Sequence, residues 1–245
     1  MAHAGDRGPV HAVARWQDCP ALGKDDLAVV FDVLRATSAV TAAFAAGVAA
    51  VLPVESVDAA RAYRTHHGDV WLAGEEHNLK PPGFDRGNSP REWGPDAAGR
   101  QVVWSTTNGT RALRRVAGAG RVLVGALVNR RAVAAQAAEH PGPIWLVAAG
   151  TRGEWALEDW LAVGAVATLL DAARWTDASR AAALAFTAAA SDLAAVVAAS
   201  SHARHLIAQG FAADLEWCAH LDRLDLVGEL RPDGWIRVAN RSRGL

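Results

Sequence analysis

Two oppositely charged side chains stand where a short apolar stretch ends. Asp32 directly follows the apolar run Leu27–Phe31, and Arg35 comes three residues later, at the start of an Ala-rich segment. A carboxylate at the end of a buried strand costs free energy unless it is paired or ligated. The order of strand, acid, turn and helix is typical of a binding site at the carboxyl end of a strand. Asp32 could therefore bind a cation or attack phosphorus while Arg35 binds an anion, although a plain surface ion pair would also explain the pattern.

Polar residues also follow a second apolar run, Val102–Ser105, before another expected helix. They are Thr106, Thr107, Asn108, Gly109, Thr110 and Arg111. The free N–H groups at a helix N-terminus attract phosphate or carboxylate, and a guanidinium binds oxyanions through two parallel hydrogen bonds. This stretch is therefore a candidate anion-binding loop, although Thr and Asn are also ordinary helix caps.

Acidic residues recur beside other apolar runs. Glu75 comes shortly after one such run, Glu158 and Asp159 come after another, and Asp85 lies in a long loop. A magnesium site needs only one or two carboxylates, because waters and a substrate phosphate complete the octahedron. Each of these acids alone could be a solvated surface residue, but their recurrence near strand ends favours a shared cation site.

The elements that position these residues alternate between strand and helix at least six times. The expected strands are Val10–Trp16, Leu27–Phe31, Val51–Val54, Trp71–Ala73, Val102–Ser105, Val122–Val124 and Ile144–Ala148. Residues 177–220 look all-helical, and two short strands, Leu224–Leu230 and Trp235–Val238, are expected to end the chain. The alternation predicts an α/β fold with a mostly parallel or mixed sheet covered on both faces. No linker or charge run divides the chain, so we expect one domain spanning residues 1–245.

One long segment, Glu76–Gly99, fits neither strand nor helix. It is rich in Gly, Pro and Asn, and it includes the run from Lys80 to Pro90. A structureless loop of this length in a compact domain is usually either functional or disordered. Phe84 and Trp93 within it favour a packed, functional loop.

The composition excludes several classes of protein. The net charge is −1 and no cluster of basic residues stands out, so nucleic-acid binding is not expected. The two cysteines, Cys19 and Cys218, form no CxxC motif, which argues against a disulfide framework and fits a reducing cytosol. No secretory signal is visible, and no apolar run reaches the roughly 18–20 residues that span a bilayer. We therefore expect a cytoplasmic protein without a membrane partner.

Four motifs in this order and spacing resemble the 2-phosphosulfolactate phosphatase (ComB) family. They are FDVLRAT at Phe31–Thr37, GFDRGNSP at Gly83–Pro90, TTNGTR at Thr106–Arg111 and GTRGEWALED at Gly150–Asp159. The resemblance extends from about residue 27 to about residue 236, and it includes His202, Gly210, Asp214 and Cys218 near the C-terminus. Any one motif alone would be weak, whereas the four together are specific.

The resemblance implies a magnesium-dependent phosphatase that hydrolyses 2-phosphosulfolactate to sulfolactate and phosphate, a step toward coenzyme M. It implies a three-layer α/β/α fold of two similar, intertwined halves. It also implies Mg²⁺ as cofactor, a small phosphorylated sulfonate or carboxylate as substrate, and a homodimer as a candidate assembly. Another small phosphorylated acid could be the physiological substrate.

Specific site residues follow from the same resemblance. Catalysis would involve Asp32, Arg35 and Asp159. The substrate would be bound by Arg35, Asn88, Thr107, Asn108, Gly109, Thr110 and Arg111, with Arg86 and Arg152 as further candidates. The candidate magnesium ligands are Asp32, Glu75, Asp85, Glu158 and Asp159.

Two alternatives remain open at this stage. A haloacid-dehalogenase type of phosphatase would form an aspartyl-phosphate on Asp32, but it needs a second Asp two residues on, where this chain has Leu34. Attack by a metal-activated water is therefore the preferred mechanism. The other alternative is a binding module for anionic metabolites that has lost the chemistry.

Overall fold

A single mixed sheet runs through the molecule. The structure is a computed structural model that describes residues 7–240. Its strands are β1 (Val10–Val13), β2 (Leu27–Phe31), β3 (Ala50–Val54), β4 (Trp71–Gly74), β5 (Gln101–Ser105), β6 (Arg121–Gly125), β7 (Ile144–Ala148), β8 (Gly228–Leu230) and β9 (Ile236–Val238). The sheet order is β1-β7-β2-β6-β8-β9-β3-β5-β4. The predicted α/β class with a mixed sheet is therefore confirmed.

Helices cover both faces of this sheet. They are α1 (Ala36–Ala45), α2 (Val57–His67), α3 (Gly109–Arg115), α4 (Arg130–Ala138), α5 (Leu157–Ala167), α6 (Asp177–Ala189), α7 (Leu193–Ala198), α8 (Ser201–Ala208) and α9 (Ala212–Ala219). Helices α1 and α3 contribute to the apolar core on one face, and α4 to α9 contribute to the core on the other. This arrangement is the predicted three-layer α/β/α architecture.

The sequence of β2 explains its central place. All five of its residues are buried. Leu27, Val29 and Phe31 belong to one core cluster, whereas Ala28 and Val30 belong to the other. Successive side chains of a strand point to opposite faces, so an uninterrupted apolar run is stable only where both faces are covered. Asp32 is thereby placed at the end of a central strand.

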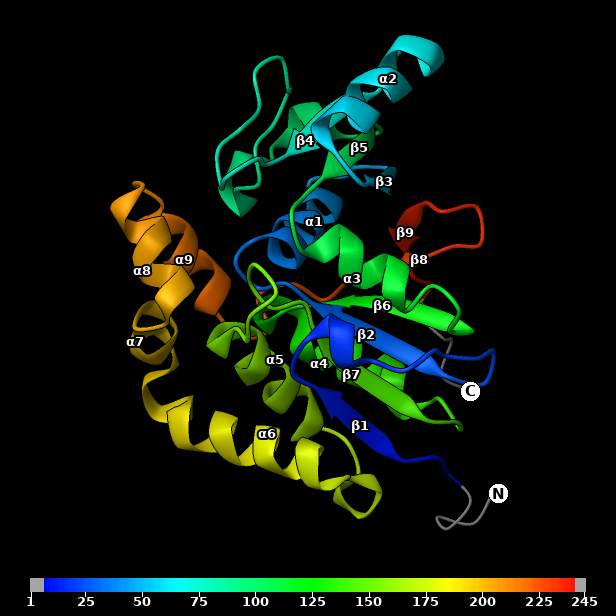
Figure 1. The fold of residues 1–245 in the computed structure, drawn as a ribbon, viewed down its shortest axis with the longest axis vertical. Coiled ribbons are helices and arrows are strands. Elements are labelled where there is room, and N and C mark those ends of the chain that lie inside the picture. The colour runs from blue at the N-terminus through cyan, green and yellow to red at the C-terminus, as the bar shows by residue number, and fades with distance from the viewer. Residues whose placement is uncertain (1–6, 241–245) are drawn as a thin grey trace.

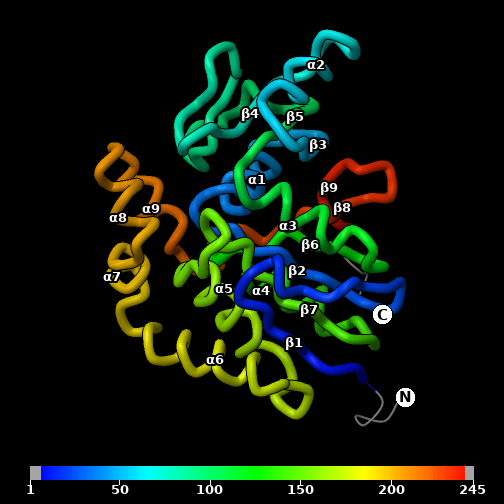
Figure 2. The backbone as a smooth tube through the Cα atoms, in the orientation of Figure 1, coloured from blue at the N-terminus to red at the C-terminus, as the bar shows by residue number. Residues whose placement is uncertain are grey.

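The strands form two parallel groups that run in opposite senses. Strands β1, β7, β2 and β6 are mutually parallel, as are β3, β5 and β4, and the antiparallel strands β8 and β9 join the two groups. The chain passes from β2 into the second group and returns to the first at β6, which can be followed in Figures 1 and 2. The two halves are intertwined in this sense.

Two of the predicted strands are too long. The strand expected at Val10–Trp16 ends at Val13, because a 3₁₀ turn at Trp16–Asp18 follows and Arg15 pairs with Asp18 at 2.9 Å. The strand expected at Leu224–Leu230 is confined to β8. Leu224 instead donates its backbone N–H to Val128 O at 2.8 Å, so its partner is a 3₁₀ turn at Leu127–Asn129 and not a strand.

The loop between β4 and β5 is packed, as its aromatic residues predicted. It contains two 3₁₀ turns, Pro90–Glu92 and Pro95–Ala97. Phe84 is buried, and Trp93 stacks on Trp104 with 5.2 Å between ring centroids. The loop thus has a defined course over the sheet, and it carries Asn88 into the interior.

The helical region after residue 170 is apolar but divided. By length and composition alone, the stretch Asp177–Ala208 is long and apolar enough to cross a membrane. In the fold, 33% of an apolar 18-residue segment within it is buried. In the fold it is divided into α6, a 3₁₀ turn at Ala190–Asp192, α7 and α8. Figure 1 shows these helices as a bent arm along one side of the molecule, with α6 lying against α5.

Close packing of α5 against α6 leads to a first prediction. A Cβ atom on Gly164 would lie 2.0 Å from Ala182 O, which belongs to the α6 backbone. Gly164→Ala should therefore lower the free energy of unfolding by about 1–3 kcal/mol, despite the better helix propensity of Ala. Urea denaturation measures this, with Gly23→Ala as control because its Cβ would meet nothing closer than 3.8 Å. Equal stability of the two variants would contradict the packing.

Candidate active site

Segments from distant parts of the sequence enclose one cavity of about 320 Å³. The loop after β2 contributes Asp32, Leu34 and Arg35; the loop after β4 contributes Glu75, His77, Asn78 and Asn88; the loop after β5 contributes Thr106, Thr107 and Asn108; the loop after β7 contributes Thr151 and Arg152; and α8 contributes Ser201, His202 and His205. Most of these residues directly follow a strand. The site is therefore assembled from strand ends of both halves of the sheet.

Asp32 lies in this cavity as a buried carboxylate, 7% exposed. Burial raises the pKa of Asp32 to about 6; His202 opposes this shift, while the carboxylates of Glu75 and Glu158 add to it. A Cβ atom on Gly109 would lie 2.9 Å from Asp32 Oδ2, so only glycine lets α3 begin this close to the acid. The environment of Asp32 thus disfavours negative charge until a cation or a proton offsets it.

Glu75 lines the same cavity, but both of its carboxylate oxygens already accept hydrogen bonds from the protein. Its Oε1 accepts hydrogen bonds from the N–H and the hydroxyl of Thr107, both at 2.8 Å. Its Oε2 accepts one from the N–H of Asn78 at 2.7 Å. Glu75 therefore ties the loop after β4 to the loop after β5 and shapes the wall of the cavity.

The guanidinium of Arg35 is also committed to partners within the protein. Nη1 donates to Asp214 Oδ2 at 2.7 Å, Nη2 donates to Asn78 O at 2.6 Å, and the group lies 3.9 Å from the ring centroid of Phe211. The other oxygen of Asp214 accepts a hydrogen bond from Ser89 Oγ at 2.7 Å. Only the remaining N–H groups of Arg35 can face a ligand, although the residue lines the cavity as expected of an anion binder.

Asp159 lies behind the cavity wall, outside the set of lining residues. Its Oδ1 accepts from the N–H of Val33 at 2.7 Å, and its Oδ2 accepts from the N–H of Gly150 at 3.0 Å. Burial raises the pKa of Asp159 well above its ordinary value, and the neighbouring Asp32 adds to this effect. The structure gives Asp159 a role that the sequence did not suggest, which is to join the loops after β2 and β7.

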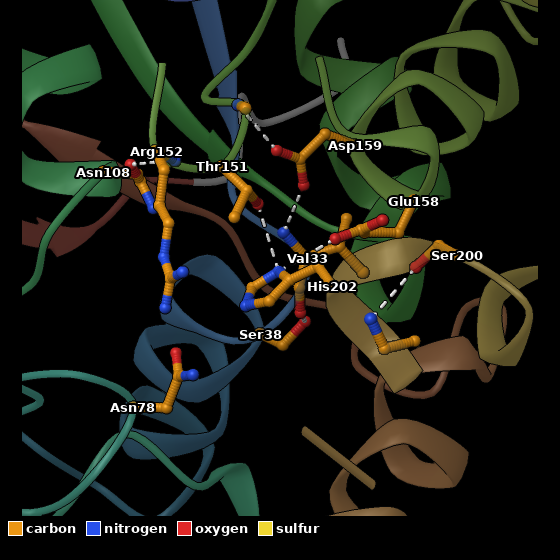
Figure 3. A network of polar contacts seen from close by, with 12 residues as sticks. Val33, Ser38, Asn78, Asn108, Thr151, Arg152, Glu158, Asp159, Ser200 and His202 are labelled. Carbon is orange, nitrogen blue, oxygen red and sulfur yellow. Dashed lines mark hydrogen bonds and ion pairs between the residues drawn. The ribbon is translucent and has the colours of Figure 1, made fainter. Parts of the chain in front are cut away.

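Glu158 contacts a histidine that lines the cavity. Its Oε1 lies 3.0 Å from His202 Nδ1, and the same nitrogen lies 3.1 Å from Thr151 Oγ1 (Figure 3). Glu158 is 1% exposed, and its Oε2 has no hydrogen-bond partner within residues 7–240. The sequence suggested Glu158 only as a metal ligand, whereas the structure places it beneath an imidazole.

Several candidates from the sequence are not brought to the cavity. Asp85 accepts hydrogen bonds from the Leu72 N–H at 2.8 Å and from Arg64 at 3.1 Å, because the long loop returns to β4 at this point. Arg86 pairs with Asp96. The first three residues of α3 also lie outside the lining set: Gly109 and Thr110 face a small apolar crevice, and Arg111 is exposed.

Other candidates do face the cavity. Asn88 is buried, and its Oδ1 has no hydrogen-bond partner among the described residues. Asn108 Oδ1 accepts the backbone N–H of Arg152 at 3.2 Å, which joins the loops after β5 and β7. The guanidinium of Arg152 extends from that loop toward Asn78 in Figure 3. Thr107 completes this group.

Some lining residues were not anticipated. His77 and Asn78 come two and three residues after Glu75 and have positive φ angles of 55° and 70°. An asparagine in a loop after a strand is a known signal for such a turn, so Asn78 could have been suspected from the sequence. Ser201 could not, because its place depends on how α8 packs.

The described residues contain no cluster of three or more His, Cys, Asp or Glu side chains arranged for a metal ion. Of the carboxylates that line the cavity, Asp32 has its pKa raised by burial and by neighbouring acids, whereas Glu75 already accepts three hydrogen bonds. Magnesium commonly uses one or two carboxylates and completes its octahedron with water and phosphate. The oxygen donors of the cavity therefore fit a magnesium ion bound at Asp32 with waters and phosphate. They do not fit a metal ion whose ligands all come from the protein.

Both cysteines are free and buried in the structure. Burial raises the pKa of Cys19 to about 11 and that of Cys218 to about 12. Neither thiol is therefore a nucleophile at neutral pH. This agrees with the expectation that the chain contains no disulfide framework.

Comparison with known proteins agrees with the motifs. A family model described as 2-phosphosulpholactate phosphatase matches residues 16–233. A probable 2-phosphosulfolactate phosphatase of Carboxydothermus hydrogenoformans is 36% identical, covering 84% of this chain and 87% of its own. Similarly named proteins of Thermotoga petrophila and Prochlorococcus marinus (strain MIT 9313) are 37% and 40% identical, covering 83% and 86% of this chain and 88% and 91% of their own. The chain belongs to the 2-phosphosulfolactate phosphatase family.

Proposed function

We propose that this protein is a magnesium-dependent phosphatase that hydrolyses 2-phosphosulfolactate, or a similar small phosphorylated acid, to the free hydroxy acid and phosphate. The names of its relatives support the reaction. The single structural observation that carries the proposal is the buried carboxylate of Asp32 in a cavity that also presents Arg152. A cation site beside an anion site is what a phosphorylated acid requires.

Magnesium would be held by Asp32, together with waters and the substrate phosphate. A bound Mg²⁺ would polarise a phosphoryl oxygen and acidify a coordinated water. The charge of the ion would offset the cost of burying the Asp32 carboxylate. Leu34, two residues further on, also lines the cavity, so the second Asp of a haloacid-dehalogenase site is missing and hydrolysis by water is favoured.

Arg152 would recognise the second acidic group of the substrate. Arg35 is paired with Asp214, whereas the guanidinium of Arg152 has no ion pair within residues 7–240. Its backbone N–H bonds to Asn108, which fixes the base of the side chain at the cavity rim. A planar guanidinium binds carboxylate or sulfonate through parallel hydrogen bonds.

The first test is metal dependence. Phosphate release from 2-phosphosulfolactate should stop when EDTA removes divalent ions and return when Mg²⁺ is added. A malachite-green assay of phosphate measures this, with EDTA plus excess Mg²⁺ as the control. Turnover that persists without metal would contradict the proposal. Thermal stabilisation by phosphate, with no ester hydrolysed, would instead support a binding module.

The second test uses Asp32→Asn. The variant should lose phosphatase activity and yet be the more stable protein without metal above pH 6. The folded-state pKa of Asp32 is about 6 and lies above the unfolded value, so the native protein loses stability as pH rises from about 4 to 6. A shift of this size corresponds to at most about 3 kcal/mol. The variant lacks this loss, and its advantage should vanish near pH 4.

Thermal unfolding of the metal-free proteins at pH 4 and pH 7.5 measures this difference. The control is Asp58→Asn, whose side chain is 91% exposed on α2 and outside the cavity. Full activity of Asp32→Asn would remove Asp32 from the mechanism. An active-site carboxylate that costs stability is a common trade-off in enzymes.

The third test compares two of the four arginines that the sequence suggested as anion binders, Arg152 and Arg111. Arg152→Gln should raise KM about 10- to 100-fold for 2-phosphosulfolactate, because one charge-assisted contact is worth about 1.5–3 kcal/mol. A phosphomonoester without a second acidic group should be affected much less. Arg111→Gln, on the exposed side of α3, should leave both KM values unchanged. If Arg111→Gln raised KM and Arg152→Gln did not, the anion binder would be the arginine of the TTNGTR motif and not the one that lines the cavity.

A further inference from the structure

The contact between Glu158 and His202 joins the start of α5 to α8 beside the cavity. Asp159 joins the loops after β2 and β7, and Arg35 joins the loop after β2 to α9. Glu158, next to Asp159 at the start of α5, is nevertheless buried with one oxygen lacking any partner among the described residues. A buried carboxylate of this kind is costly unless it offsets a positive charge.

The geometry fixes how the imidazole of His202 presents itself. An ionised carboxylate can only accept a hydrogen bond, so Nδ1, at 3.0 Å from Glu158 Oε1, must carry the proton. Thr151 Oγ1 lies 3.1 Å from the same nitrogen and limits rotation of the ring. The second ring nitrogen, Nε2, is not involved in these contacts and can face a ligand. In Figure 3 it points away from Glu158, toward the side where Arg152 and Asn78 lie, which are both cavity residues.

From this arrangement we infer that His202 is the general acid of the phosphatase, with Glu158 and Thr151 as its positioning residues. Hydrolysis forms a bond from phosphorus to a water oxygen and breaks the bond from phosphorus to the ester oxygen. The ester oxygen leaves with the electron pair of the broken bond. In this step the ring starts doubly protonated: Nδ1–H stays bonded to Glu158, and Nε2 donates its proton to that oxygen, which becomes the hydroxyl of the product acid. The ring then regains a proton on Nε2 from solvent, and the attacking water releases one of its two protons to solvent.

No other ring or acid in the described cavity is placed for this step. Glu75 accepts three hydrogen bonds and has no proton to give. His77 and His205 line the cavity, but they are exposed and form no hydrogen bond to a carboxylate in the part of the chain that the structure describes. Asp32 is the proposed cation ligand. His202 alone combines a fixed orientation with a paired acid.

The experiment is a leaving-group series, and it rests on the proposed function. Rates are measured for monoesters that the wild-type protein hydrolyses, with leaving groups from alkyl alcohols to phenols. An alkoxide needs a proton to leave, whereas a phenolate does not. His202→Gln should lose at least about 100-fold in kcat with alkyl esters and less than about 10-fold with aryl esters. The dependence of rate on leaving-group acidity should therefore become steeper.

Two further variants separate catalysis from structure. Glu158→Gln can keep a contact to the ring but not the negative charge, so it should steepen the same dependence more mildly, with unchanged KM and unchanged thermal stability. His205→Gln lies three residues away on α8 and lines the same cavity. Its leaving-group dependence, whatever its rate, should match the wild type.

The outcomes distinguish the two proposals. If the wild-type protein hydrolyses no phosphomonoester, the proposed function fails. If it does, and His202→Gln lowers all rates by the same factor, His202 is not the proton donor and the inference is overturned. If Glu158→Gln keeps the leaving-group dependence of the wild type, Glu158 is not a positioning residue and that part of the inference is overturned.

Discussion

One buried guanidinium connects three separate segments of this chain around the cavity. Arg35, 2% exposed, bonds to Asp214 on α9 and to the backbone of Asn78 in the loop after β4, and it stacks on Phe211. Removing one partner of a buried ion pair costs about 3–5 kcal/mol, because the other charge is left unpaired in a medium of low polarity. The cavity can therefore keep its shape only while this contact is intact.

The acidic residues around the cavity have different roles, which depend on the groups that each of them contacts. Glu75 and Asp159 accept backbone N–H groups and hold loops together. Asp214 holds Arg35, and Glu158 holds His202. Asp32 is left facing the cavity with a raised pKa. Five carboxylates thus concentrate negative charge in a small volume, but only one of them is available to a metal ion from the cavity side.

This division has an energetic consequence for function. Accepting N–H groups stabilises a carboxylate as an anion. At Asp159, however, burial outweighs the two N–H donors and raises the pKa well above its ordinary value. Asp32 has one such contact, with the backbone of Ala36, and burial still raises its pKa to about 6, so its burial works against folding at neutral pH. A cation bound beside Asp32 would offset this cost. Glu158 is likewise buried, and its Oε2 has no hydrogen-bond partner among residues 7–240.

The sequence by itself determined the elements and the residues that directly follow them. The apolar run of β2 requires a central, doubly covered strand, and it places Asp32 at the strand end whatever the rest of the chain does. The tertiary structure decided which polar residues meet. Asp85 and Arg111 belong to motifs as clear as those of Asp32 and Asn88, yet neither lines the cavity. Asp85 lies where the long loop returns to β4, and Arg111 lies on the exposed side of α3. Periodicity is a local property, whereas the partners of Asp159, Glu158 and Arg35 lie 126, 44 and 179 residues away in the chain. Contacts of that range depend on how the halves of the sheet pack, and no local pattern encodes them.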